Sequence, residues 1–419
     1  MSSLETVYFL IKKYLIEEKQ LRAVSKTIKN YYEMNTVFPF YIKNYDLAVK
    51  FIHVYNSRIN LIVNDFKFLK KFNSMSLKYV ECLYISIKTK KDIDFSLFKN
   101  LTHIKEICIY SEECIKNFPQ IVYLKNIKNL HLGNCASPKD FKKLKNNIFL
   151  EYLHLDWCDY LEDLSCFKNL KSVKRLHLPH CGFLNDLTDI VHLTNIETLN
   201  LSFCENLTDI SPIKALKNLK HLDLSSCYLI SDISPIVDLI SLKELNISKC
   251  YLISDISSIA NLINIETLNM LQCKGIIDIS PFIKLVHIKK LYMSLCEEEL
   301  LDSSPLANLV SLKFLEISNC KNLYNLINLN SVLIDTININ NCPNLNNLFS
   351  ISGIKSVKNL MVSYCDNIND ISHIAMLQEL ENITFNCCDS LYDMSPLNTL
   401  GLLKDDNMFN ITRFQKNTI

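Results

Sequence analysis

Cysteine is the residue type whose spacing most directly suggests chemistry in this chain. Twelve of the 17 cysteines recur every 23 residues, with single steps of 24 and 22: Cys135, Cys158, Cys181, Cys204, Cys227, Cys250, Cys273, Cys296, Cys320, Cys342, Cys365 and Cys388. Thiolates can bind zinc, but the chain contains no C-x-x-C pair. Disulfides between stacked strands are disfavoured, because parallel Cβ vectors give poor S–S geometry. We therefore predict a structural ladder of buried, reduced thiols without metal.

Histidine is the second candidate for chemistry, because His131, His154 and His177 repeat at the same interval. Imidazole is a common zinc ligand. On strands about 4.8 Å apart, however, three such side chains cannot all reach one ion without strained rotamers. No carboxylate or thiolate clearly completes the set, and no Ser/His/Asp arrangement indicates nucleophilic catalysis. We therefore predict no metal site, no cofactor and no enzymatic activity.

Aromatic residues accompany these histidines. Trp157, His180 and Phe203 each stand directly before a ladder cysteine, and Tyr152 shares a predicted strand with His154. Large exposed aromatic side chains are the usual anchors of protein interfaces. The predicted partner-binding surface consists of Tyr152, His154, Trp157, His177, His180 and Phe203. A plain solvated face is the alternative interpretation.

The elements that position these residues follow from the repeat itself. Leu222 and Leu224 alternate with polar residues in the segment HLDLSSC, as in a strand with one buried face. The pair Ser234-Pro235 predicts an N-cap followed by proline in the first turn of a short helix or 3-10 turn. About fourteen such repeats fill residues 73–400. The sequence predicts an α/β repeat solenoid, curved, with a concave parallel sheet and short convex turns.

The repeats carry a family resemblance. Their period and the pattern L-x-x-L-x-L-x-x-C resemble leucine-rich repeats over about three quarters of the chain. The D-I-S-P half of the repeat is similar to repeats of bacterial internalins and of phosphatase regulators. Cysteine in the usual asparagine position resembles the repeats of many F-box proteins. In these groups the concave face typically binds protein, so the resemblance implies a protein partner on that face.

Residues 1–72 precede the repeats and predict a small helical head, because apolar residues follow helical spacing there. One interpretation is a cap, since the ends of a solenoid need shielding. The segment LETVYFLIKKYLIEEKQLRAVSKTIKNYYE is also similar to an F-box, although the usual Leu-Pro opening is absent. That resemblance implies docking to a Skp-type linker of a cullin ubiquitin ligase through Leu4, Ile11, Leu15, Leu21 and Val24. Residues 401–419 are a predicted C-terminal cap or tail.

Composition narrows the class of protein further. Only 5 glycines occur, and no glycine-rich phosphate-binding motif is present. No apolar run is long enough to span a membrane, and the charged N-terminal stretch is unlike a signal peptide. The basic residues of the head are scattered, so nucleic-acid binding is not predicted. Free thiols on this scale fit a reducing cytosol, and we predict a cytoplasmic protein.

The sequence thus predicts a non-enzymatic, protein-binding repeat protein. The leading hypothesis is a substrate receptor of a cullin-type ubiquitin ligase that binds its target on the concave face. The alternative is an intracellular scaffold or regulator, similar to the phosphatase regulators, whose head is only a cap. A surface receptor is less favoured, because the thiols are free and no signal peptide is recognisable.

Overall fold

The computed structural model describes most of the repeat region and short parts of the flanking segments. The described residues are 39–41, 59–63, 80–87, 101, 103–111, 124–134, 144–294, 304–320, 329, 332–354, 356–400 and 409–412. The chain divides into unit 1 (Met1–Leu178) and unit 2 (Pro179–Ile419). In the part of the chain that is described, no helix has both the length and the apolar character needed to cross a membrane.

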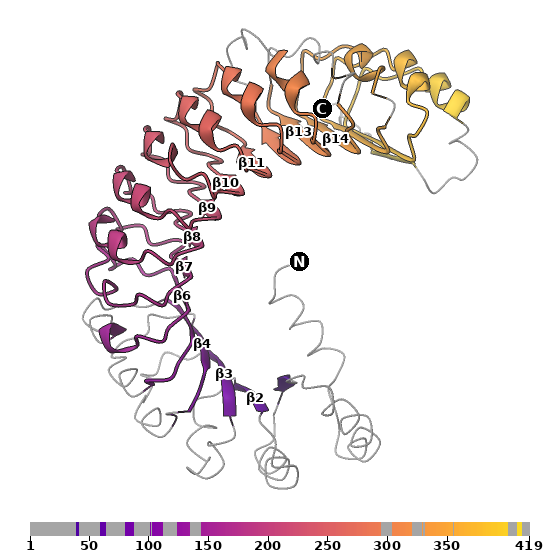
Figure 1. Ribbon diagram of the computed structural model, residues 1–419. Helices are drawn as coiled ribbons and strands as arrows, with labels where there is room; N and C mark the ends of the chain where they lie inside the picture. Colours follow the sequence, from indigo (N-terminus) through magenta and orange to yellow (C-terminus); the bar gives the residue numbers. More distant parts are fainter. Residues whose placement is uncertain are drawn as a thin grey trace, which may run out of the picture. The chain divides into compact units, whose positions relative to one another are not determined.

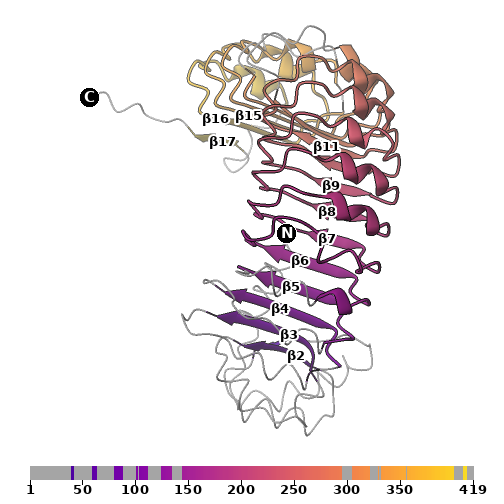
Figure 2. The same ribbon diagram turned by 90° about the vertical axis from the view of Figure 1, so that its left-hand side faces the viewer.

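Unit 1 is a stack of parallel strands. In chain order these are β1 (Pro39–Tyr41), β2 (Ile59–Val63), β3 (Val80–Ile87), β4 (Glu106–Ser111), β5 (Asn129–Gly133), β6 (Tyr152–Asp156) and β7 (Arg175–His177). Each strand pairs in parallel with the next along the chain. Figure 2 shows β2 to β6 side by side. A 3-10 turn, η4 (Leu144–Asn146), precedes β6.

Two strands of unit 1 fall within the predicted head. β1 and β2 pair in parallel with each other, and β2 pairs with β3, so parallel pairing already begins upstream of residue 73. The rest of residues 1–72 lies outside the described residues. This includes all five F-box-like positions, Leu4, Ile11, Leu15, Leu21 and Val24. The helical head and its boundary therefore stay predictions.

Unit 2 repeats the same architecture. Its parallel strands are β8 (Thr198–Asn200), β9 (His221–Asp223), β10 (Glu244–Asn246), β11 (Thr267–Met270), β12 (Lys290–Met293), β13 (Phe314–Ser318), β14 (Thr336–Asn340), β15 (Asn359–Ser363), β16 (Asn382–Asn386) and β17 (Phe409–Thr412). Each pairs with the next. Within unit 2 the strands line the inner side of the curve (Figure 1).

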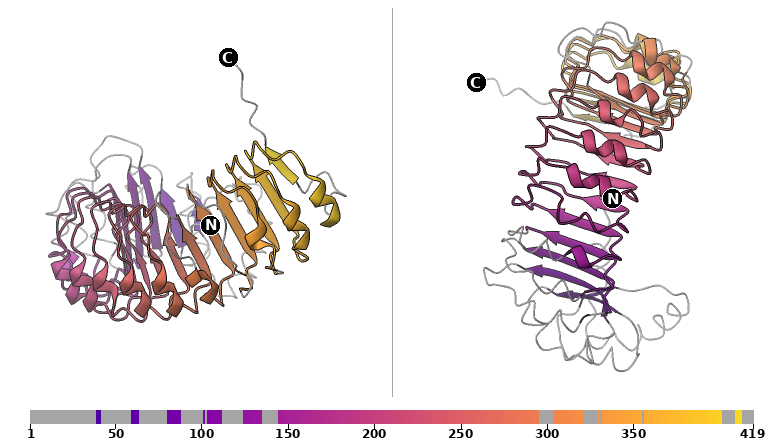
Figure 3. Two further views of the ribbon diagram at one scale, coloured as in Figure 1. Left: turned by 90° about the horizontal axis from the view of Figure 1, so that it is seen from above. Right: turned by 60° about the vertical axis from the view of Figure 1, so that its left-hand side comes forward.

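Short 3-10 turns occupy the outer side of unit 2. They are η5 (Thr188–His192), η6 (Ser211–Ala215), η7 (Ser234–Ile236), η8 (Ser257–Asn261), η9 (Ser280–Lys284), η10 (Ser304–Asn308), η11 (Phe349–Ile351), η12 (Ser372–Met376) and η13 (Ser395–Leu400). Figure 3 shows the turns following one another along this side. The predicted solenoid, with a concave parallel sheet and short convex turns, is confirmed.

Aliphatic side chains and the ladder cysteines fill the interior. Leu222 is 2% exposed and Leu224 is 0% exposed. The described ladder cysteines are buried, reduced thiols: Cys158, Cys181, Cys204, Cys227, Cys250, Cys273, Cys320, Cys342, Cys365 and Cys388. Cys135 and Cys296 lie outside the described residues. Burial raises the pKa of the Cys227 thiol well above its ordinary value, so this side chain stays protonated and is available as a hydrogen-bond donor.

These thiols tie neighbouring repeats together. The Sγ–H of Cys227 donates to the carbonyl oxygen of Leu201 over 3.1 Å, and Cys250 donates to Leu224 over the same distance. A small weak donor of this kind satisfies a buried carbonyl in a space too narrow for a larger polar side chain. Within the described residues, packing and hydrogen bonding therefore account for the ladder.

Most of the 3-10 turns begin at serine, but in η7 serine is not the cap. In η7 the preceding residue, Ile233, makes no side-chain cap hydrogen bond, and Ser234 is already the first residue of the turn. Asp232 closes the turn instead, since its Oδ1 accepts the Ser234 N–H over 2.7 Å. The predicted Ser-Pro N-cap is wrong by two residues, because aspartate reaches the backbone N–H two positions later.

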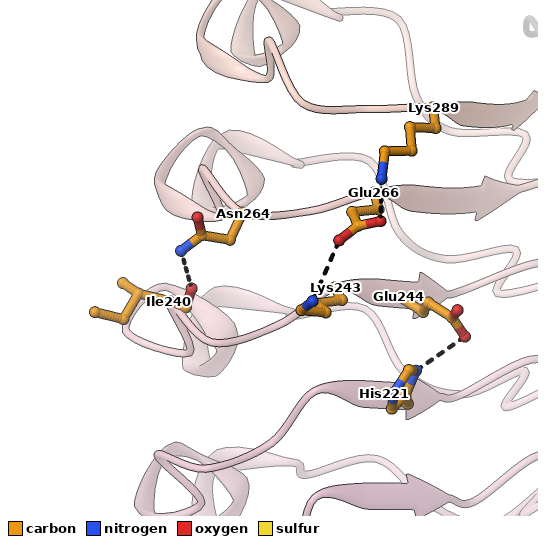
Figure 4. Close-up of polar contacts among 7 residues, drawn as sticks. All are labelled: His221, Ile240, Lys243, Glu244, Asn264, Glu266 and Lys289. Carbon is orange, nitrogen blue, oxygen red and sulfur yellow. Dashed lines mark hydrogen bonds and ion pairs between the residues drawn. The ribbon is translucent and has the colours of Figure 1, made fainter. Parts of the chain in front are cut away.

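Charged side chains stack in register where the strands begin. Glu266 contacts Lys243 at 3.3 Å and Lys289 at 2.6 Å, so one carboxylate serves lysines of two neighbouring repeats (Figure 4). His221 Nδ1 similarly lies 3.0 Å from Glu244. These pairs are solvent-exposed, so each contributes little to stability. They align the repeats but do not determine the stability.

Candidate functional site

The strand face of unit 1 carries a column of three histidines. Strand pairing sets His131 of β5 beside His154 of β6, and His154 beside His177 of β7. The rings of His131 and His154 stack with their centroids 3.8 Å apart and their planes at 21°. The rings of His154 and His177 lie 5.4 Å apart and are tilted. All three side chains are half-buried. The predicted column therefore exists, and we call it the histidine column.

Two tyrosines hold the histidine column in place. Tyr110 Oη lies 3.2 Å from His131 Nδ1, and Tyr152 Oη lies 3.1 Å from His154 Nδ1. A hydroxyl that donates to Nδ1 requires a neutral ring with its proton on Nε2. Both Nε2 atoms are buried without a hydrogen-bond partner among the described residues. Desolvation, followed by the neighbouring imidazoles, lowers the pKa of His131 to about 4 and of His154 to about 3. These two rings are uncharged at neutral pH.

Charged residues share this face of unit 1. The guanidinium carbon of Arg175 lies 4.5 Å from the centroid of the Tyr152 ring, which is a cation–π contact. Glu106 accepts hydrogen bonds from Tyr84 Oη at 2.7 Å and from Asn129 Nδ2 at 2.9 Å. The face is therefore aromatic and polar at once, with its large side chains held in place by their neighbours.

Trp157 stands at the end of this face. It follows β6 directly, its φ is 54°, and its side chain is 52% exposed. The same left-handed backbone recurs before every described ladder cysteine. The residues that adopt it are Asn134, Trp157, His180, Phe203, Ser226, Lys249, Gln272, Asn319, Asn341, Tyr364 and Cys387. Trp157 thus projects from a turn whose conformation the repeat fixes.

Unit 2 contains a separate aromatic pair. The rings of His180 and Phe203 stack with centroids 4.3 Å apart and planes at 17°, and both side chains are half-buried. The backbone N–H of each donates into the next repeat, His180 to Ser202 O at 2.9 Å and Phe203 to Ser225 O at 2.8 Å. The six predicted site residues therefore form two groups, one in each unit.

The histidine column is not arranged as a metal site. His131 and His154 lie as stacked rings, and His177 is tilted against His154 at a centroid distance of 5.4 Å. Throughout the described ranges, no three or more His, Cys, Asp or Glu side chains are placed to hold a metal ion. His131 and His154 instead offer flat aromatic surface that is uncharged at neutral pH.

Two features of the site escaped sequence reasoning. The left-handed turn was detectable, because asparagine recurs there at Asn134, Asn319 and Asn341 and no residue at this position is β-branched. The role of Tyr110 was not detectable, because Tyr110 does not occupy the repeat position of the histidines and contacts His131 only through its rotamer.

Comparison with known proteins agrees with this architecture. The family model "Leucine Rich repeats (2 copies)" matches residues 194–238. An internalin (InlF) from Listeria monocytogenes is similar in structure, with a TM-score of 0.57 and 19% identity over 83% of this chain and 93% of that one. An LRR protein of Leptospira interrogans has a TM-score of 0.58 and 18% identity over 89% of this chain and 99% of that one. None of the curated proteins matches. The chain therefore contains leucine-rich repeats at residues 194–238, and it has the fold of a leucine-rich repeat solenoid.

Proposed function

We propose that this leucine-rich repeat protein binds a protein partner on its strand face and performs no catalysis itself. The observation that carries the proposal is the group formed by Trp157, Tyr152 and Arg175 around β6 and β7. Tryptophan, tyrosine and arginine are the residues most enriched in interface hot spots. Trp157 is 52% exposed on a fixed turn, and Arg175 lies against the Tyr152 ring. Such preorganisation lowers the entropy cost of binding.

The remaining predicted site residues extend this proposal. His154 and His177 flank Tyr152, and a partner can desolvate the uncharged His154 ring at low cost. In unit 2, His180 and Phe203 provide a second aromatic contact surface. We propose each surface as a contact in its own right.

We further propose that this protein is the cytoplasmic substrate receptor of a cullin-type ubiquitin ligase and that the partner is its substrate. The support is the F-box-like segment with Leu4, Ile11, Leu15, Leu21 and Val24, together with cysteine-type repeats of the kind found in F-box proteins. The alternative is a scaffold or regulator whose head only caps the repeats.

An affinity experiment with the full chain tests the binding proposal. The protein retains its partner on a column, and the affinity is then measured with purified components. Trp157→Ala should weaken binding by about 2 kcal/mol or more, as truncation of an anchor does. Tyr160→Ala is the matched control, because Tyr160 is 55% exposed in the same unit but is not part of the proposed group. Equal affinity of wild type and Trp157→Ala, or equal loss in the control, would contradict the proposal.

The ligase role is tested separately. Leu15→Asp combined with Val24→Asp should abolish recovery of a Skp-type linker and a cullin while the strand-face partner is retained. A phosphatase or other enzyme recovered without linker and cullin would favour the alternative. Loss of stability and protease resistance in the double variant, without any linker in the wild-type sample, would identify the head as a cap.

A further inference from the structure

An exposed row of aliphatic side chains runs along unit 2 away from the strand face. It consists of Ile240, Ile263, Val286, Val310 and Leu333, which are 58, 52, 39, 57 and 62% exposed, respectively. Each lies three or four residues before the paired residues of β10 to β14, so strand register sets the five side by side on consecutive repeats. Figure 4 shows Ile240 beside its turn, with Asn264 of the next repeat bonded to its carbonyl oxygen over 2.9 Å. We call this the outer aliphatic row.

The interior of the repeats does not require this row. The interior at this level is already filled by fully buried neighbours, such as Leu239 and Leu242 beside Ile240. The same repeat position is Thr194 or Lys217 upstream of the row and Gln378 downstream of it. Within unit 2, apolar residues at this position therefore occur on five consecutive repeats, whereas unit 1 has one exposed aliphatic residue there, Ile148. Contiguous exposed apolar surface of this kind marks interaction sites.

The spacing of the row matches one type of ligand. Parallel strands lie about 4.8 Å apart, and the spacing widens toward the outer side of a curved stack. An α-helix advances 5.4 Å per turn, so a helix along the row presents one side chain to each repeat. Five repeats correspond to four turns, or about 15 residues.

The charged residues on one flank of the row narrow the choice of ligand further. Lys243, Lys289 and Lys313 have 51, 57 and 51% exposed side chains, and the first two share the single carboxylate of Glu266. Lys313 meets Asp335 only at 3.8 Å. Three lysines against Glu266 and Asp335 give this flank a net charge of 3 − 2 = +1. The row itself contains only branched aliphatics and none of the tryptophan or tyrosine typical of membrane-interface anchors.

We propose that the outer aliphatic row docks an acidic amphipathic α-helix of a partner protein. The helix carries apolar residues at i, i+4, i+7, i+11 and i+14, and glutamate or aspartate on the side that meets Lys243 and Lys289. This surface is distinct from the proposed strand-face site and goes beyond the function proposed for it.

The test uses the full chain and a synthetic peptide of about 18 residues, with leucine at those five positions and glutamate on one flank. Saturable binding with a gain of helical circular dichroism is expected. Ile263→Glu with Val286→Glu should weaken binding at least about tenfold, because two apolar contacts become like-charge repulsions. Thr194→Glu with Gln378→Glu is the matched control, at the same repeat position outside the row. It should bind the peptide normally, as should Trp157→Ala.

Several results would overturn the proposal. These are no saturable binding, equal binding of a peptide with the same composition in scrambled order, or equal weakening by the control pair. If the double variant Ile263→Glu with Val286→Glu has a lower melting temperature than the wild type, the double variant Lys243→Glu with Lys289→Glu is tested in its place. The proposal then requires that this second variant bind the acidic peptide less tightly than the wild type does. Binding to phosphatidylserine vesicles but not to the peptide would assign the row to a membrane. A dimer of the full chain that is lost in the variant would assign it to a second copy.

Discussion

The middle outward position of the repeat serves different purposes in the two units. In unit 1 it carries the histidine column, whose rings lie against one another, with a tyrosine hydroxyl within hydrogen-bonding distance of His131 and of His154. In the first four repeats of unit 2 it carries Asn200, Asp223, Asn246 and Asn269. The Oδ1 atom of each accepts the backbone N–H two residues further on, over 2.8 to 3.1 Å. The same repeat position thus makes contacts between side chains in the histidine column, whereas it closes backbone turns in the first repeats of unit 2.

This difference affects where the strands end. β8, β9 and β10 end at their Asn or Asp residue, because the side chain closes a turn there. β5 and β6 continue two residues beyond their histidine, whereas β7 ends at His177. A side chain that closes its own turn is committed to the fold, whereas one without that role can recognise a ligand. The comparison therefore favours the histidine column over the first four repeats of unit 2 as the more adaptable strand face.

The largest expected effect tests what the two units share. Cys158 in unit 1 and Cys227 in unit 2 are both 0% exposed. Replacing either with aspartate buries an unpaired carboxylate and should cost about 3 kcal/mol or more of unfolding free energy. Denaturant midpoints of Cys158→Asp and Cys227→Asp measure this, with Cys→Ala at the same positions as controls. An unchanged midpoint for either aspartate variant would show that the interiors are not equivalent.

The next effect is a pH dependence restricted to unit 1. The folded-state pKa values of His131 and His154 lie near 4 and 3, below the unfolded value of about 6.5. The unfolded chain therefore binds more protons between these limits, and stability falls as the pH drops from about 6.5 toward 4. The loss should be on the order of 2 kcal/mol, because half-burial leaves part of the charge solvated.

Trp157 makes this measurement specific, because it is the single tryptophan and directly follows β6. Its fluorescence during denaturation at pH 7 and at pH 5 reports on unit 1. The variant His131→Phe with His154→Phe keeps the stacked rings but cannot titrate, so its stability should change less over this range. If the stability of the variant and that of the wild type changed equally with pH, the histidine column would not be the cause of the pH dependence.

A smaller effect tests turn closure in unit 2. Asp223 Oδ1 accepts both the backbone N–H of Ser225 at 2.8 Å and its hydroxyl at 2.6 Å. Asp223→Ala should cost about 1 kcal/mol, the usual value for losing such a side-chain cap, whereas Asp223→Asn keeps the acceptor. Hydrogen exchange of the peptide that contains Ser225 should accelerate only in the alanine variant. If alanine is as stable as asparagine, the hydrogen bond does not determine where β9 ends.

The sequence predicts the repeat architecture well because burial alternates along a strand and recurs with a fixed period. Leu222, Leu224 and Cys227 follow directly from that regularity. The cap of the turns was misassigned to Ser234, since serine and aspartate both favour such positions and only geometry separates them. Contacts such as Arg175 on Tyr152 depend on rotamers of neighbouring repeats, which no periodicity encodes. The F-box-like segment stays a prediction.

The smallest expected effect concerns the left-handed turn that both units share. Lys249 has a φ of 62° and Trp157 a φ of 54°, a region that asparagine and glycine occupy with less strain than other residues. Lys249→Asn should therefore raise the unfolding free energy by about 0.5 kcal/mol, and Lys249→Val should lower it by more than about 1 kcal/mol. Trp157→Asn should gain stability like Lys249→Asn, yet lose partner binding. Denaturation and affinity measurements on the same three variants separate the two effects. If Trp157→Asn binds the partner normally, Trp157 does not anchor the partner. Unit 1 then keeps a strained tryptophan for a reason other than recognition, and the proposal that Trp157 belongs to the binding surface is contradicted.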